Sequence, residues 1–254
     1  MTMIPPSIYL ITGANRGIGK GFVQRILQKP STTVVAAVRD PSHSTSKALV
    51  DLPKGADTKL IIVKLDTAIT TDAAKAVAYI RSQGITSLDI VIANAGIAQD
   101  GTSVLSTSVA NALKHFQVNT LGPLTLVQAT ADLLKASKTG APKFVVISTI
   151  IGSISSQEIF SHFPKTSSPY GASKTSLNWF IRLLSFEEPW LTSILFHPGV
   201  VETDLTVASG MDLRALDAIS VETSVANMVE TTFAFEHKEI TGTFRNHDGA
   251  IIPW

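Results

Sequence analysis

The sequence predicts a single α/β domain with a doubly wound parallel sheet of about seven strands and helices on both faces. Three observations lead to this fold class. The 254 residues suffice for one large domain with a sizeable core. Short apolar runs alternate with helical stretches along the chain. The first run, Ile8–Thr12, leads into a glycine-rich turn and a helix, as nucleotide-binding α/β folds begin. We expect one domain over residues 1–254.

Seven apolar runs are expected to form the strands. Most are continuously apolar, which suits strands that are buried on both faces of a parallel sheet. The strands are expected at Ile8–Thr12, Thr33–Val38, Lys59–Leu65, Leu88–Ala93, Lys143–Ser148, Leu191–Phe196 and Gly242–Asn246.

Helical stretches lie between these strands. They are expected at Gly17–Leu27, Ala73–Gln83, Val109–Ala136, Tyr170–Phe186 and Val221–Phe235. The third contains Gly122-Pro123 and should therefore form two helices. Two irregular segments, 153–169 and 204–220, follow strands. They should lie at the carboxyl ends of the strands, where such sheets bind ligands.

The composition narrows the class of protein and its surroundings. A net charge of +1 without a basic block argues against nucleic-acid binding. No apolar run is long enough to span a membrane, and residues 1–7 are too few for a signal peptide. The chain has no cysteine, which excludes disulfides, thiolate metal sites and cysteine nucleophiles, and we assign no metal. A cytoplasmic protein is expected.

The glycine-rich turn is the first candidate binding site. Gly13 permits a tight turn, Gly17 lets the backbone approach a pyrophosphate, and Gly19 allows close packing of helix and strand. The N–H groups that open the helix can bind phosphate oxygens. The spacing is G-x-x-x-G-x-G instead of G-x-G-x-x-G, so a purely structural turn is the alternative. Asn15 and Ile18 belong to the same expected site.

Tyr170 and Lys174 are the first candidate catalytic pair. They are four residues apart on an expected helix and therefore share one face. An ammonium beside a phenol favours the phenolate and should lower the tyrosine pKa from about 10. Such a tyrosine can donate a proton to a carbonyl oxygen or accept one from an alcohol. A chance Tyr-x-x-x-Lys is the alternative.

Polar side chains at strand ends are further candidates. Ser148 and Thr149 end one strand, where their hydroxyls could bind a substrate oxygen or merely form a turn. The small residues of Asn94-Ala95-Gly96 could let the backbone approach a ligand, or make a tight turn. Asn119 lies within a helical stretch, where it could distort the helix or bind water. An exposed asparagine is the more common explanation.

Arg39 and Asp40 bear on the choice of cofactor. In dinucleotide-binding folds, an acidic residue at the end of the second strand binds the 2′-hydroxyl of the cofactor ribose, whereas an arginine there accommodates a 2′-phosphate. Arg39 is nearer the strand end, and Arg16 in the glycine turn could bind the same phosphate. The sequence therefore favours NADP(H) over NAD(H), with Asp40-Pro41 as a turn.

Taken together, the motifs resemble the short-chain dehydrogenase/reductase family over essentially the whole chain. The shared pattern comprises Thr12 to Gly19, Asn94 to Gly96, Asn119, the Ser148-Thr149 pair, Tyr170 with Lys174, and Pro198-Gly199. Within the family the chain looks most like fungal ketoreductases. That likeness rests on Val34–Arg39 with Asp40-Pro41, on Ile147–Thr149 and on Asp248–Trp254.

The resemblance implies a Rossmann-type fold and further cofactor contacts. Asp66 matches the family acid that holds the adenine amino group, and Thr203 matches the residue near the nicotinamide carboxamide. The cofactor-binding set is completed by Pro198, Gly199 and Val201. Asn119 would order a water that links Lys174 to solvent.

Two departures from the family pattern concern the substrate side. The catalytic hydroxyl normally stands three residues before the glycine of Ser-x-x-Gly, and counting back from Gly152 gives Thr149, with Ser148 as the alternative. Thr149 and Tyr170 are also further apart than is usual. The extra residues lie in Gly152–Pro169 and include Ile159, Phe160, His162 and Phe163. They predict a pocket for an apolar or aromatic substrate.

The expected reaction is the NADPH-dependent reduction of a ketone or aldehyde to an alcohol. Tyr170 would donate the proton, Lys174 would bind the ribose and lower the tyrosine pKa, and Thr149 would hold the carbonyl oxygen. The alternatives are an NAD-dependent alcohol dehydrogenase and a non-catalytic NADP(H) sensor. A halohydrin lyase would want Arg where Lys174 stands. The resemblance also suggests a homodimer or homotetramer built on the 109–136 and 170–186 helices.

Overall fold

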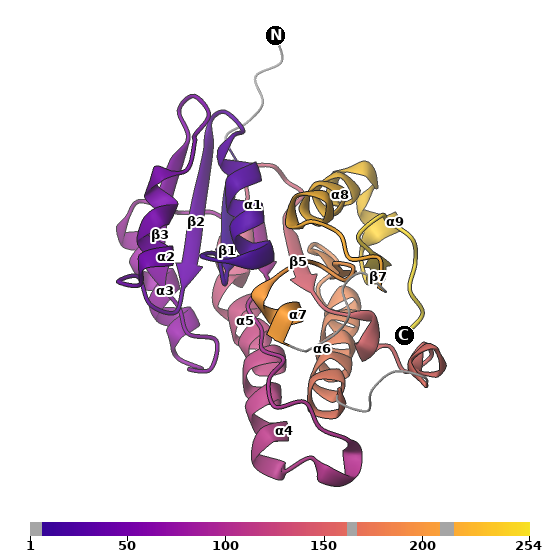
Figure 1. Cartoon of the computed structure of the whole chain (residues 1–254). Helices are drawn as coiled ribbons and strands as arrows, with labels where there is room; N and C mark the ends of the chain where they lie inside the picture. The colour runs from indigo at the N-terminus through magenta and orange to yellow at the C-terminus, as the bar shows by residue number, and fades with distance from the viewer. Residues whose placement is uncertain (1–6, 162–166, 209–215) are drawn as a thin grey trace.

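A computed structural model describes residues 7–161, 167–208 and 216–254. Seven parallel strands form one sheet in the order β3-β2-β1-β4-β5-β6-β7, which confirms the doubly wound, Rossmann-type fold (Figure 1). The strands are β1 (Ser7–Thr12), β2 (Thr32–Val38), β3 (Lys59–Lys64), β4 (Ile90–Ala93), β5 (Lys143–Ile147), β6 (Thr192–His197) and β7 (Thr243–Asn246). Each coincides with an expected strand to within two residues at either end.

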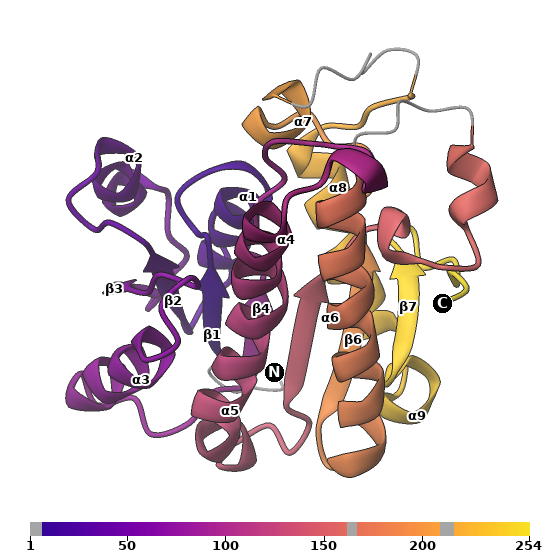
Figure 2. The same ribbon diagram turned by 90° about the horizontal axis from the view of Figure 1, so that it is seen from below.

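Helices cover both faces of this sheet. One face carries α1 (Gly17–Leu27) and α8 (Val221–Ala234). The other carries α3 (Asp72–Ser82), α5 (Gly122–Lys135) and α6 (Ser168–Glu187), with α4 (Val109–Phe116) beside α6 (Figure 2). Shorter helices, not expected from the sequence, are α2 (Ser44–Lys47), α7 (Asp204–Ala208) and α9 (His237–Ile240). The 3₁₀ turns are η1 (Ala48–Asp51), η2 (Val104–Ser106), η4 (Ile150–Gly152) and η5 (Gln157–Phe160).

The central strands are apolar throughout because alternate side chains enter two different cores. In β1, Leu10 packs into the core beneath α3, α5 and α6, whereas Ile11 packs beneath α1 and α8. Phe144 and Val145 of β5 divide in the same way. Since successive side chains of a strand point to opposite faces, only a continuous apolar run can supply both cores.

The stretch 109–135 forms two helices, as expected, joined by the π-helix Gln117–Leu121 (η3). Pro123 lies in the first turn of α5, where its missing N–H would have had no partner within that helix. Gly122 is required at the start of α5, since an added Cβ would lie 2.9 Å from the Cβ of Thr67. In the described part of the chain, no helix is both long and apolar enough to cross a membrane.

Candidate active site

The candidate residues gather at the carboxyl ends of the central strands. Gly13 follows β1, Asn94 follows β4, Ser148 follows β5 and Pro198 follows β6. All these strands are parallel and adjacent, so their carboxyl ends lie along one edge of the sheet, at the end where Figure 2 shows α7. The sheet order, which reverses direction beside β1, places this edge where α/β proteins bind ligands.

The glycine turn depends on the absence of side chains. Gly13 and Gly17 have φ angles of +63° and +49°, which residues with a Cβ rarely adopt. A Cβ on Gly19 would lie 2.2 Å from the Gly13 carbonyl oxygen, so helix α1 can approach the turn only with glycine there. Arg16 occupies the N-cap of α1 but makes no side-chain cap, and the first turn carries no acid. The leading N–H groups of α1 are therefore suited to an anion.

Asn94-Ala95-Gly96 is locked against the end of β1. The Thr12 hydroxyl accepts hydrogen bonds from the backbone N–H groups of Asn94 and Ala95, both at 3.0 Å. The Asn94 amide donates to the Thr12 carbonyl at 2.9 Å. A Cβ on Gly96 would lie 3.1 Å from Asn119 Oδ1 and 3.6 Å from Lys174 Nζ. This glycine thus leaves open the space beside the lysine.

Asn119 is completely buried, so the explanation as an exposed helix residue is wrong. It lies in the π-helix, a wider turn that often occurs at functional sites. Its Oδ1 accepts from the Ile97 N–H at 2.8 Å, and its Nδ2 donates to the Ile97 carbonyl at 2.9 Å. The Nδ2 also donates to Ser173 Oγ at 3.0 Å. The N–H and the carbonyl of Ile97, a residue outside any strand, therefore both have the Asn119 side chain as their partner.

The structure brings Tyr170, Lys174 and Thr149 together. Tyr170 and Lys174 share the inner face of α6, and the Lys174 Nζ lies 6.0 Å from the centroid of the phenol ring. The Tyr170 hydroxyl forms a hydrogen bond with the Thr149 side chain. The Lys174 ammonium donates to the Ile147 carbonyl at 2.8 Å. A proton donor, a second hydroxyl and a cation therefore meet at the end of β5.

The pKa of Tyr170 differs from the expectation. Burial raises it to about 12, although the hydrogen bond with Thr149 lowers it somewhat. The expected lowering by Lys174 is wrong for this state, because the ammonium engages a backbone carbonyl and the loss of hydration dominates. Burial also lowers the pKa of Lys174 from 10.5 to about 8. Tyr170 is therefore neutral at pH 7, and Lys174 is mostly charged.

The two hydroxyls at the end of β5 have different partners. The Ser148 hydroxyl donates to Asn178 Oδ1 at 2.5 Å in a buried contact, and the Asn178 amide donates to the Gly152 carbonyl at 3.2 Å. Thr149 instead faces Tyr170. Successive residues of extended backbone point in opposite directions, which explains the division. Asn178 is a residue that no sequence motif indicated.

Arg16 and Arg39 are both exposed and lie at the ends of adjacent structural segments, the glycine turn and β2. The Asp40 carboxylate accepts from the Ser42 N–H at 2.8 Å and from its hydroxyl at 2.6 Å, contacts that lower the pKa of Asp40. Asp40 therefore serves the turn that the sequence predicted. Asn15 donates to the Thr45 hydroxyl at 2.7 Å.

The remaining expected cofactor residues border this edge of the sheet. Asp66 is half-buried after β3, and its Oδ1 accepts from the Ala68 N–H at 2.9 Å. Gly199 has a φ angle of +84°, and buried Val201 pairs with Ile219 in an isolated β-bridge. A Cβ on Gly17 would meet the Thr203 side chain at 3.4 Å, so Thr203 and the glycine turn are neighbours. The other two, Ile18 and Pro198, are half-buried and buried.

The two segments expected on the substrate side are described in part. Ile154, Ile159, Leu205 and Val207 carry exposed apolar side chains there. The positions of His162 and Phe163, and the side chain of Phe160, lie outside the described residues. Contacts between the segment after β5 and the last two residues of the chain were not expected from the sequence. The Ser153 hydroxyl donates to the Pro253 carbonyl at 2.6 Å, and the Ser155 N–H donates to the Trp254 carbonyl at 2.8 Å.

The fold and the site together define a nucleotide-binding α/β protein whose glycine turn adjoins a Thr–Tyr–Lys cluster. The family model for short chain dehydrogenases matches residues 7–213. The chain belongs to this family of oxidoreductases.

Similar proteins extend over nearly the whole chain. A norsolorinic acid ketoreductase of Dothistroma septosporum is 39% identical and covers 97% of this chain and 92% of its own. One from Aspergillus parasiticus is 36% identical, with 98% and 93% covered. The NADPH-bound carbonyl reductase from chicken fatty liver is 30% identical, with 98% and 99% covered and a TM-score of 0.85. The expected likeness to fungal ketoreductases is confirmed.

Proposed function

We propose that this protein is an NADPH-dependent carbonyl reductase that converts a ketone or aldehyde of apolar or aromatic character into an alcohol. The observation that carries the proposal is the cluster of Thr149, Tyr170 and Lys174 at the end of β5. Such a cluster can bind a carbonyl oxygen, donate a proton to it and compensate the charge left behind. The norsolorinic acid ketoreductases among the relatives support this reaction class.

The residues at the edge of the sheet fit NADP(H). The uncapped start of α1 suits the pyrophosphate, and exposed Arg16 and Arg39 suit a 2′-phosphate. Gly96 leaves space beside Lys174, which we assign to the nicotinamide ribose. The remaining contacts are proposed for Gly13, Asn15, Gly17, Ile18, Gly19, Asp66, Asn94, Ala95, Tyr170, Pro198, Gly199, Val201 and Thr203. The NADPH bound to the chicken carbonyl reductase supports this choice.

When bound, NADPH supplies the hydride that adds to the carbonyl carbon. The Thr149 hydroxyl holds the carbonyl oxygen, where negative charge develops in the transition state. Tyr170 is neutral at pH 7 because its pKa is about 12, so it carries the proton that this oxygen needs. The resulting phenolate is stabilised by the Lys174 ammonium, and a water ordered by Asn119 would return the proton from solvent.

The substrate class rests on the side chains that border the site. Ile154 and Ile159 lie on the segment between β5 and α6, and Leu205 and Val207 lie on α7. All four are exposed on segments that follow β5 and β6 at the ligand edge of the sheet, and exposed apolar side chains near a ligand site favour a partner of like character. An aliphatic or aromatic ketone should therefore bind better than a small charged one.

The test compares wild type with Tyr170→Phe, following NADPH consumption with a panel of aliphatic and aromatic ketones and aldehydes. Phe keeps the ring and removes the proton donor. We expect NADPH binding to persist while reduction falls by about 10²–10⁴-fold. A Tyr170→Phe variant as fast as wild type on the best substrate would contradict the mechanism. A wild type that binds NADPH but reduces none of the panel would indicate a sensor, and equal use of NADH would favour the NAD-dependent alternative.

We also propose a homodimer or homotetramer located in the cytoplasm. Helices α4 and α6 lie side by side on the same face of the molecule (Figure 2). They expose Val109, Leu113, Trp179 and Phe186, and an apolar patch of this kind favours an interface between copies.

The proposed cytoplasmic location is supported by the absence of cysteine, because such a chain forms no disulfide and gains nothing from an oxidising compartment.

A further inference from the structure

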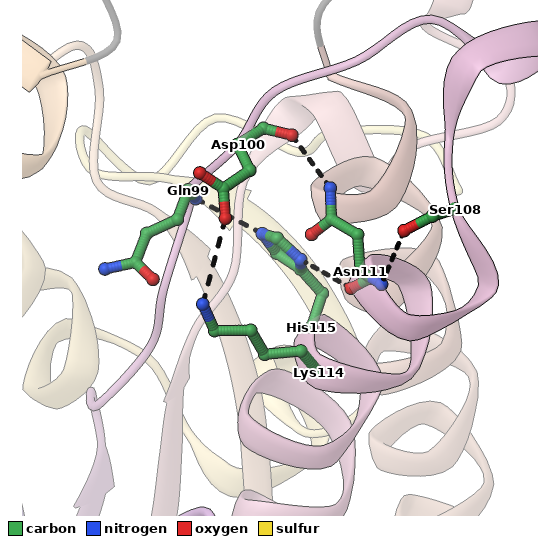
Figure 3. A network of polar contacts seen from close by, with 6 residues as sticks. All are labelled: Gln99, Asp100, Ser108, Asn111, Lys114 and His115. Carbon is green, nitrogen blue, oxygen red and sulfur yellow. Dashed lines mark hydrogen bonds and ion pairs between the residues drawn. The ribbon is translucent and has the colours of Figure 1, made fainter.

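The connection between β4 and α4 has no strand partner, so its backbone groups need other partners. Side chains of α4 and the following π-helix supply them. Asn119 binds Ile97, as described above. In addition, the Nε2 of His115 accepts from the Gln99 N–H at 3.2 Å. The Nδ2 of Asn111 donates to the Asp100 carbonyl at 2.8 Å. Figure 3 shows both side chains pointing from the helix to the loop.

These three side chains form one regular arrangement. Asn111, His115 and Asn119 are spaced four residues apart, and side chains at this spacing lie along one helix face. Proceeding along the helix, they bind loop residues in reverse order, from Asp100 through Gln99 to Ile97. The loop therefore runs antiparallel to the helix and is attached at three successive points.

His115 acts here as a neutral imidazole. It is completely buried, and its Nδ1 lies 3.0 Å from the Asn111 carbonyl, which can only accept. Nδ1 therefore carries the proton, and Nε2 is free to accept from Gln99. Asp100 has a φ angle of +48°, a conformation with a steric cost for residues other than glycine. The Asn111 contact helps to hold the backbone in that conformation.

The far end of the same loop reaches the catalytic helix. The Ser168 N–H, two residues before Tyr170, donates to the Thr102 carbonyl at 3.2 Å. The Thr102 and Thr107 hydroxyls are joined at 2.8 Å. The loop thus spans from Gly96, beside Lys174, to the start of α6. A shift of the loop would alter the space in front of Tyr170.

We propose that His115 and Asn111 are positioning residues that hold the loop 97–102 as a fixed wall of the substrate site. This rests on the proposed carbonyl reduction, and the wall would set the orientation of the carbonyl compound against Tyr170. Neither residue touches the reacting atoms, so both act through the backbone of Gln99 and Asp100.

The test uses two replacements of His115 in the full chain. His115→Leu removes the acceptor for Gln99, whereas His115→Gln offers a carboxamide with an acceptor oxygen and an NH₂ group that can donate. With His115→Leu we expect the KM for the carbonyl substrate to rise about tenfold. The kcat and the Kd of NADPH should change by less than about twofold. In His115→Gln the KM should return most of the way to the wild-type value. Lys114→Ala is the matched control, because its 3.8 Å ion pair with Asp100 is exposed and should contribute little.

Hydrogen exchange supplies a readout that does not need turnover. The Gln99 amide should exchange faster in His115→Leu than in wild type, Lys114→Ala or His115→Gln. If His115→Leu does not fold, Asn111→Ala replaces it, with about a threefold rise in KM expected from the loss of one hydrogen bond. The proposal would be overturned if His115→Leu changed neither the exchange of the Gln99 amide nor the KM. It would also be overturned if KM, kcat and the Kd of NADPH were all impaired to the same extent. A wild type that reduces no carbonyl compound would contradict the proposed function only. The positioning role of His115 would still be tested by the exchange of the Gln99 amide.

Discussion

At the scale of single residues, the two hydroxyls at the end of β5 differ in what they can do. The Ser148 hydroxyl is committed to Asn178, whereas Thr149 faces Tyr170. Thr149→Val keeps the side-chain shape and deletes the hydroxyl, so turnover should fall about 10²-fold or more. Ser148→Ala should reduce it far less. Steady-state kinetics with saturating NADPH checks the ranking, and the opposite order would assign the catalytic hydroxyl to Ser148.

In the proposed mechanism, Lys174 should make the rate of reduction depend on pH. Its pKa is lowered to about 8, so the ammonium that compensates a Tyr170 phenolate is lost as the pH rises through that value. The rate of reduction at saturating NADPH should therefore decline above about pH 8. A pH profile checks this, with Lys174→Met expected to be slow and free of that step.

The same lysine should affect stability in the opposite direction. Between pH 8 and 10.5 the unfolded chain holds the Lys174 proton and the folded chain has released it. Since the unfolded state then binds more protons, the free energy of unfolding should rise with pH in this window. Lys174→Met should make that rise smaller in urea titrations, and Lys29 and Lys143, whose pKa values burial also lowers, would supply what remains. The pKa of Tyr170 is raised from 10.0 to about 12. Above pH 10 the folded chain therefore keeps a proton that the unfolded chain has lost, and the free energy of unfolding should fall as the pH rises.

Arg39 decides the cofactor preference in our proposal. One charge-assisted contact to a phosphate contributes about 1.5–3 kcal/mol, at least tenfold in affinity. Arg39→Asp should therefore weaken NADPH binding by at least about tenfold and NADH binding by much less. Titration of both nucleotides by protein fluorescence measures this. Equal Kd values for NADPH and NADH in wild type would remove the role of Arg39.

Among the elements, the π-helix between α4 and α5 holds the loop after β4 through one side chain, that of Asn119. Asn119→Leu would leave the N–H and carbonyl of Ile97, which are partly buried, without their partner. An unsatisfied buried group costs about 1–3 kcal/mol and a partly buried one falls at the lower end, so we expect the free energy of unfolding to fall by about 2 kcal/mol. Denaturant titration measures it. Thr125→Ala is the control, since it removes only a hydroxyl bond to the Gly122 carbonyl. Equal effects would show that Asn119 has no special role.

At the scale of the whole molecule, the exposed face of α4 and α6 leads to a prediction about assembly. Trp179 and Phe186 are each more than 60% exposed, although both are large apolar side chains. Trp179→Glu should shift a homodimer or homotetramer toward monomer, because a charge would be buried without a partner. Light scattering after size exclusion measures the mass. A wild type that is already a monomer would contradict the proposed assembly.

The order of strands and helices was predictable because it depends on local patterns. Short continuous apolar runs rich in β-branched residues, such as Thr33–Val38, favour strands that serve two cores, and Gly122-Pro123 marks the start of α5. The short helices α2, α7 and α9 were not predictable, because four or five residues carry too little periodicity. Asn119 was misjudged for a related reason, since a π-helix has no distinct local pattern.

The fold class, the glycine turn and the Tyr170–Lys174 spacing could all be predicted from the sequence, since covalent distance and local periodicity decide these. The packing of the folded chain was needed to establish that Thr149 and not Ser148 meets Tyr170, and that the Lys174 ammonium binds the Ile147 carbonyl. It also decided that burial raises the pKa of Tyr170. These properties depend on which distant atoms come within hydrogen-bond distance and on how much water they lose, and no local pattern contains that information.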